Sequence, residues 1–152
     1  MDKRTEFSVA LKEALKNKDK IAMSTIRLMM AALKDRDITA REKGDSDGIG
    51  DAEILQMLQS MIKQRQDSSK IYSEAGRDDL AEREEIEIDV IRGFMPKQLS
   101  EEEVGAIIDE KIAALKIESI KDMGKIMGVL KSEYAGQIDM GKAGGLVKAR
   151  LG

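Results

Sequence analysis

Apolar residues recur every three or four positions in seven segments of this chain. Such spacing places the apolar side chains on one face of an α-helix and leaves the opposite face polar. The segments run from Phe7 to Leu15, Ala22 to Leu33, Ile54 to Tyr72, Leu80 to Phe94, Val104 to Leu115, Ile120 to Tyr134 and Met140 to Leu151. The pattern therefore predicts seven amphipathic helices.

Aspartates stand where three of these helices should begin. Asp19, Asp51 and either Asp78 or Asp79 precede apolar stripes, and an aspartate at this position can accept a hydrogen bond from the free amides of the first turn. Ser100 with Glu103 has the spacing of a capping box. We expect all four positions to cap the helices that follow them.

Glycine and proline mark the breaks between the helices. The segment 44–50 is rich in glycine and aspartate and should form a loop, and Ala75 with Gly76 should end the third helix. Pro96, the only proline, cannot continue a helix. The alternation at 86–90 resembles a strand, but helical patterns flank it and we predict helix there. The expected fold is all-α, with an N-terminal helical bundle subdomain at 1–96 and a small three-helix subdomain at 97–152.

Composition removes several classes of chemistry. The chain has no cysteine and no histidine, so it lacks a thiol nucleophile, a zinc–thiolate site and the commonest general base. We expect no metal and no cofactor, and a complete active site is not evident. The N-terminal residues are amphipathic rather than apolar, and no window is long and apolar enough for a bilayer. These features favour a cytoplasmic protein without a membrane role.

Charge is distributed unevenly. The net charge is +4 over residues 1–43, -6 over 44–98 and -1 over 99–152. Within the last part the acids cluster early, and six basic residues follow. They are Lys121, Lys125, Lys131, Lys142, Lys148 and Arg150. These six are the candidate contacts to nucleic-acid phosphates, even though the net charge of the whole chain, -3, gives no global reason to expect such a partner.

Three motifs invite a chemical interpretation, and for each the plainer one is favoured. Gly136–Ala143 has the spacing of a phosphate-binding loop, but Ala143 replaces the residue that would hold magnesium, so a helix end and a loop capped by Asp139 are expected. The acidic loop 45–51 has Ile49 where calcium needs an oxygen ligand, so a solvated turn is favoured. The carboxylates at 82–89 are expected to face solvent or to pair with arginines.

Gly124 and Gly128 are four residues apart and share a helical face. Each costs about 1 kcal/mol relative to alanine inside a helix, so both need a reason. One reason is close approach of a neighbouring helix, the last one, near Gly144 and Gly145. The other is close approach of a ligand backbone, with Lys125 beside it to meet a phosphate. Packing is the favoured explanation of the two.

A set of short segments in fixed order resembles the GatB/YqeY family. The set comprises Lys63–Arg65, Tyr72, Ala75–Ala81, Glu85 with Glu87 and Ile88, Met95–Ser100, Gly124–Gly128, Asp139 and Leu146–Lys148. Each segment is weak alone, but together they extend over nearly the whole chain. The family includes small stand-alone YqeY-like proteins and the tail region of the GatB component of the glutamine-dependent aspartyl/glutamyl-tRNA amidotransferase.

The resemblance implies two helical subdomains, the second similar to the module that grips tRNA in the amidotransferase. It implies no catalytic residues, because the ATP-dependent and amidase sites of that enzyme lie in regions that this chain does not resemble. Whether the chain is an enzyme is left open. We expect a tRNA-binding or adaptor module related to glutamine-dependent carbon–nitrogen ligases, with tRNA and amidotransferase subunits as partners. The alternative is a helical protein–protein interaction module without an RNA role.

Overall fold

The computed structural model describes residues 2–152, which form seven α-helices and a short 3-10 helix, with no strand in that range. The helices are α1 (Lys3–Lys16), α2 (Lys20–Glu42), α3 (Asp51–Glu74), α4 (Asp78–Arg92), α5 (Glu101–Leu115), η1 (Ile120–Asp122), α6 (Met123–Glu133) and α7 (Met140–Leu151). The predicted all-α fold is confirmed, and the segment 86–90 is helical within α4.

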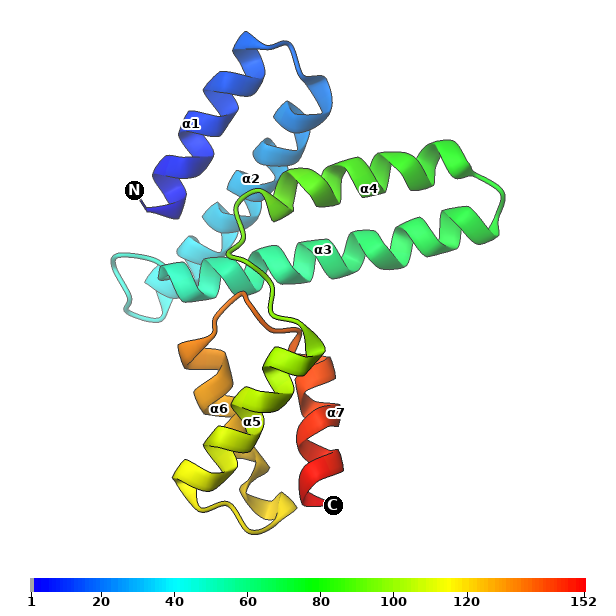
Figure 1. Cartoon of the computed structure of the whole chain (residues 1–152). Coiled ribbons are helices and arrows are strands. Elements are labelled where there is room, and N and C mark those ends of the chain that lie inside the picture. Colours follow the sequence, from blue (N-terminus) through cyan, green and yellow to red (C-terminus); the bar gives the residue numbers. More distant parts are fainter. Residues whose placement is uncertain (1) are drawn as a thin grey trace. The chain divides into compact units, whose positions relative to one another are not determined.

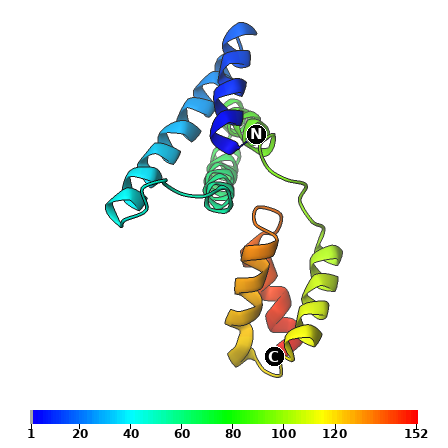
Figure 2. The same ribbon diagram turned by 90° about the vertical axis from the view of Figure 1, so that its left-hand side faces the viewer.

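The chain divides into a compact unit that ends at Met95 and a second that runs Pro96–Gly152. In the first unit, α1 and α2 form one helical hairpin and α3 and α4 form a longer one (Figure 1). In the second unit, α5, α6 and α7 pack as a three-helix bundle, also visible from the side in Figure 2. The division falls one residue from the boundary expected at Pro96.

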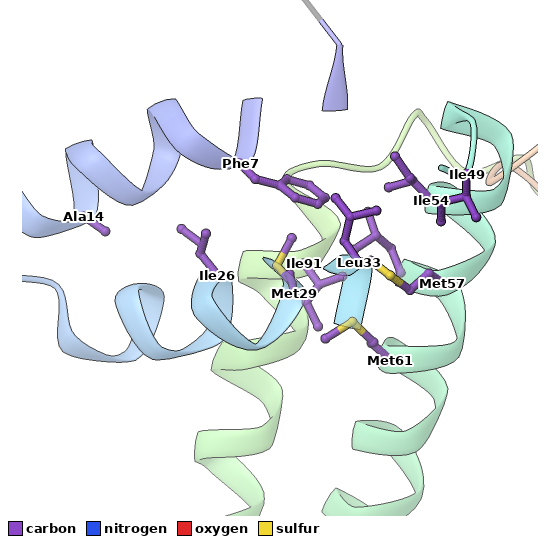
Figure 3. Packing of buried hydrophobic residues seen from close by; sticks show 11 residues of the cluster. Phe7, Ala14, Ile26, Met29, Leu33, Ile49, Ile54, Met57, Met61 and Ile91 are labelled. Carbon is purple, nitrogen blue, oxygen red and sulfur yellow. The ribbon is translucent and has the colours of Figure 1, made fainter. Parts of the chain in front are cut away.

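The core of the first unit is assembled from all four of its helices. Phe7 of α1, Met29 of α2, Ile54 of α3 and Ile91 of α4 are fully buried and meet in one apolar cluster (Figure 3). Phe94 closes this cluster by meeting the Phe7 ring edge-to-face, with the ring centroids 5.0 Å apart. Burial of such side chains contributes roughly 1.5–3 kcal/mol each relative to exposure, so this cluster holds the two hairpins together.

The core of the second unit joins α5, α6 and α7. Its fully buried residues are Ile108, Ile126, Leu130, Ala143 and Val147. The backbone amide of Leu99 donates to Gln137 O at 2.9 Å. This bond ties the segment that enters α5 to the loop between α6 and α7.

The predicted helix boundaries are right where a side chain caps the first turn. Asp19 accepts from Ala22 N, Asp139 accepts from Gly141 N and Lys142 N, and Ser100 with Glu103 forms the full capping box. At α3 and α4 the prediction is wrong. The N-caps are Gly50 and Arg77, without a side-chain cap. The acids that follow them lie in the first turn, where a negative charge interacts favourably with the helix dipole.

Candidate nucleic-acid interface

The exposed side of α6 carries glycine and lysine in one row. Gly124, Gly128 and Lys131 follow one another at spacings of four and three, and all are exposed, as is Lys121 in the preceding η1. The opposite side of α6 presents Ile126 and Leu130 to the core. Sequence periodicity therefore separates a buried apolar side from an exposed side on which the helix backbone is bare.

A second row lies on α7. Gly141, Gly145 and Lys148 recur at spacings of four and three, and all are exposed. Ala143 and Val147 occupy the buried side of the same helix.

The two rows border the same seam. A Cβ at Gly144 would lie 3.5 Å from Met123 Cε and 3.9 Å from Met127 Cε, so this part of α7 lies against α6. Lys148 follows Gly144 by one turn, and Lys131 follows Met127 by one turn, so each row runs beside that contact. We call the combined surface the glycine–lysine face. Its residues are Lys121, Gly124, Gly128, Lys131, Gly141, Gly145 and Lys148.

The helix-packing explanation for Gly124 and Gly128 is wrong. Nothing lies within 4 Å of a Cβ built at either glycine, and both residues are exposed. Gly144 is the glycine that meets the neighbouring helix, although at ordinary van der Waals distance. The spacing of Gly124 and Gly128 shows that they share one side of α6. It does not show whether that side faces a neighbouring helix or solvent. In the structure Ile126 and Leu130 occupy the buried side.

The six predicted basic residues do not form one group. Among the described residues, Lys121, Lys131, Lys142 and Lys148 have no ion-pair partner, and Lys142 lies on the side of α7 away from the seam. Lys125 is 71% exposed at its side chain and lies 3.7 Å from Asp122, a weak contact. The structure therefore brings Lys121, Lys131 and Lys148 to the glycine–lysine face, with Lys125 at its edge.

Arg150 belongs to the opposite flank of α7. Its Nε donates to Asp109 Oδ1 of α5 at 2.5 Å, and its Nη1 donates to Leu146 O. The guanidinium also covers Gly105, which is buried beneath it. A glycine inside a helix permits close approach of a neighbouring side chain, so the sequence signal for this contact is Gly105 itself.

The acidic loop considered for calcium is held by protein groups. Asp37 of α2 accepts from Arg4 Nη2 at 2.6 Å and from Ile49 N at 2.9 Å, while Arg4 also donates to Ile49 O. Burial alone raises the pKa of Asp37, but these hydrogen bonds outweigh it and hold the pKa below its usual value. Over residues 2–152 no group of three or more potential metal-ligating side chains is present. The expected solvated turn is in fact anchored from one side.

The carboxylates at 82–89 are engaged within the α3–α4 hairpin. Glu87 is buried and pairs with Arg65 at 3.0 Å and with Arg83 at 3.4 Å. Glu85 accepts from the Ser69 hydroxyl at 2.9 Å. Burial, aided by the nearby charge of Glu87, raises the pKa of Glu84. The predicted pairing with arginines is confirmed for Glu87, which uses its carboxylate to join two helices.

No helix among residues 2–152 combines the length and apolar character that a membrane crossing requires.

Comparisons with known proteins support the resemblance found in the sequence. The family model described as YqeY-like protein matches residues 4–151. Three similar proteins are called altered inheritance of mitochondria protein 41, mitochondrial. The Saccharomyces cerevisiae protein is 29% identical over 85% of this chain and 66% of its own length. The Lachancea thermotolerans protein is 29% identical over 76% and 61%, and the Pyrenophora tritici-repentis protein 27% over 84% and 68%.

These relatives also correct the expected location and show how much of their length this chain spans. The expected cytoplasmic location is contradicted, because the relatives are named as mitochondrial proteins. That expectation rested on composition and on the character of the first residues, which do not distinguish one aqueous compartment from another. The chain spans between 61% and 68% of the length of these relatives. With the family model covering residues 4–151, the chain belongs to the YqeY-like protein family.

Proposed function

We propose that the unit Pro96–Gly152 is a non-catalytic tRNA-binding module, which contacts backbone phosphates through the glycine–lysine face. The observation that carries the proposal is the pair Gly124 and Gly128, exposed on α6 with open space above them. A glycine inside a helix costs about 1 kcal/mol relative to alanine. Two such glycines without a packing partner are typical of a surface that another backbone approaches closely.

The cations around these glycines suit an anionic backbone. Lys121, Lys131 and Lys148 are exposed and without an ion-pair partner among the described residues, so contact with phosphate breaks no existing pair. Contacts of this kind position a protein on nucleic acid without reading bases. The chain has only two tyrosines and two phenylalanines, which also favours recognition of shape over base stacking.

The test is a titration of labelled tRNA with the full chain at about 50 and 200 mM salt. Because the named relatives are mitochondrial, a mitochondrial tRNA is compared with a bacterial one. The double variant Lys131→Ala, Lys148→Ala should weaken binding and reduce the slope of log K against log salt by about two. Lys63→Ala with Lys70→Ala, both exposed on α3, is the matched control.

A further variant separates the effect of charge from that of close approach. Gly128→Leu adds bulk where space is open, so the fold tolerates it while a ligand backbone is kept at a distance. We expect weaker tRNA binding with an unchanged salt slope. Absence of binding at low salt, or binding that is indifferent to both the lysine and the glycine changes, would refute the proposal.

We further propose that such a module acts as an adaptor beside a catalytic partner. The support is the lack of histidine and cysteine, together with the structural engagement of Glu85 and Glu87. The resemblance points to subunits of a glutamine-dependent amidotransferase. Adding the chain to those subunits should raise the rate of amide formation on misacylated tRNA. An unchanged rate, together with no copurification, would remove this part of the proposal while leaving tRNA binding intact.

A further inference from the structure

The side of α2 that faces away from the core of the first unit carries a stripe of half-exposed apolar side chains. Leu28 is 50% exposed and Ile38 is 43% exposed, and Ala31 between them is also exposed. With Ile21, Ser24 and Asp35 they recur at alternating spacings of three and four, the pattern of a helix seam. The core residues Ile26, Met29 and Leu33 lie on the opposite side of the helix.

A row of cations runs along one edge of this stripe. Its members recur every seven residues and all are exposed: Lys20, Arg27, Lys34 and Arg41. Among the described residues none of the four forms an ion pair, and Arg41 donates only to the carbonyl of Ser46. At about 1.5 Å rise per residue, the row extends roughly 30 Å along the helix. The charge of Arg41 also acts on Asp37, whereas Lys20, Arg27 and Lys34 remain available to a ligand with acidic groups.

Two of these cations also border a hollow. Lys34 and Arg41 line a surface pocket of about 270 Å³ between α1 and α2, whose other lining residues are Arg4, Phe7, Ser8, Met30, Leu33 and Asp37. Because Arg4 already pairs with Asp37 there, a carboxylate that enters the pocket meets Lys34 and Arg41 beside apolar side chains of the same pocket.

We propose that α2 docks an amphipathic helix of another protein, with apolar residues facing Leu28 and Ile38 and acidic residues facing the row Lys20, Arg27, Lys34 and Arg41. Asp35 lies within the apolar stripe and is exposed. A polar residue at one seam position fixes the register and orientation of two helices. The partner helix therefore carries a basic or amide side chain opposite Asp35.

The arrangement of charge disfavours a second copy of α2 as the occupant. In an antiparallel pair of identical helices the cation rows face each other and repel. In a parallel pair each row meets the other flank, where the partly buried Ala32 and the exposed Thr39 offer no acid. A symmetric dimer through this surface leaves all the cations unneutralised in either case.

Asp35 likewise disfavours a lipid bilayer, because insertion of the stripe would carry an ionised carboxylate toward an apolar and often anionic surface.

The test uses two synthetic helical peptides with the same leucine stripe and an asparagine placed to meet Asp35. One carries glutamate and the other lysine at the flanking positions. By fluorescence anisotropy at low salt, the full chain should bind the acidic peptide at least about tenfold more tightly, equivalent to about 1.4 kcal/mol. Equal affinities for the two peptides, or no saturable binding of either, would overturn the proposal.

Variants then assign the binding to this surface. Arg27→Glu with Lys34→Glu should reverse the preference toward the lysine peptide, and Leu28→Ser with Ile38→Ser should weaken the acidic peptide by about tenfold. The matched controls lie on α3, where Lys63 and Lys70 are exposed and Ile71 is 64% exposed. Lys63→Glu with Lys70→Glu, and Ile71→Ser, should change nothing. All variants alter exposed side chains, and circular dichroism checks that they fold.

Three outcomes assign the surface to another occupant and reject the partner helix. The first is a dimer in light scattering that Leu28→Ser with Ile38→Ser abolishes. The second is binding to phosphatidylcholine–phosphatidylserine vesicles that depends on the same two residues. The third is tRNA binding that Arg27→Glu with Lys34→Glu abolishes while neither peptide binds.

Discussion

The guanidinium of Arg150 lies over Gly105, so that a Cβ at position 105 would be 2.7 Å from its Nη2 atom. One residue of α7 thus covers the backbone of α5, and its Nε holds Asp109 one turn further along. Glycine at position 105 leaves room for the guanidinium to lie directly over the backbone of α5. Arg150, which the sequence grouped with the candidate phosphate contacts, is therefore engaged in helix packing.

We expect Gly105→Ala to be nearly neutral for stability. The Arg150 end group is flexible and can move, and the exposed Arg150–Asp109 pair is worth about 0–1 kcal/mol. Against this, alanine gains about 1 kcal/mol over glycine within a helix. Urea unfolding should therefore shift by less than about 1 kcal/mol, while the Arg150 Nε–H resonance moves. A loss well beyond this range would show that the backbone, not the side chain, gives way.

Arg150→Ala should leave tRNA affinity unchanged within about twofold, because the guanidinium already has a carboxylate partner and releases no counterion on binding. Lys148→Ala, on the same helix, is the matched comparison and should reduce the affinity. The measurement is the same labelled-tRNA titration. Equal losses for the two variants would mean that Arg150 leaves Asp109 to reach the RNA.

Gly128→Ala should make the second unit more stable. The position is in the middle of α6 with open space above it, so alanine adds helix propensity of about 0.5–1 kcal/mol without a clash. Gly124 lies in the first turn, where the gain should be smaller. Hydrogen exchange of the α6 amides would detect the slower opening. A variant that is both more stable and weaker in tRNA binding would show why the glycine is kept.

The sequence predicted the helices well because their stripes are long and regular, as in Phe7–Leu15 and Val104–Leu115. It failed at the starts of α3 and α4, where acids near a helix start fit the cap and the first turn equally. The orientation of the candidate site was harder to predict from the sequence, for a related reason. Spacing shows that Gly124 and Gly128 share a side, whereas the direction of that side depends on where α5 and α7 pack, which is tertiary information.

The link between Asp37 and the loop 44–50 should depend on pH. The pKa of Asp37 is lowered in the folded state, so its contribution is fully present above the ordinary value of 3.8 and is lost as the pH falls through the lower, folded value. Asp37→Asn leaves Arg4 without its carboxylate and should cost about 2 kcal/mol at neutral pH. The stability difference from the parent protein should shrink below about pH 4. A difference that is constant down to pH 2 would exclude the ion pair as its source.

Gly48 offers a second test of the contact between Asp37 and the loop 44–50. It has φ of 81°, and a Cβ there would press directly on the Asp37 carboxylate. Gly48→Ala should therefore destabilise the protein by more than Gly44→Ala, since Gly44 also has positive φ but has open space around it. The comparison isolates the contact with Asp37 from the cost of the backbone conformation. Equal effects of the two substitutions would assign the whole cost to φ.

Removing one partner of the buried pair Arg65 and Glu87 should destabilise the protein more than removing both. Arg65→Met leaves the Glu87 carboxylate buried, with only Arg83 at 3.4 Å, and should cost about 2–4 kcal/mol in urea unfolding. Arg65→Met with Glu87→Leu removes the unpaired charge and supplies apolar surface between α3 and α4. It should recover most of that loss, because desolvating two charges offsets much of their attraction. If the double variant is as unstable as the single one, the ion pair itself holds the hairpin together, rather than merely satisfying a buried charge.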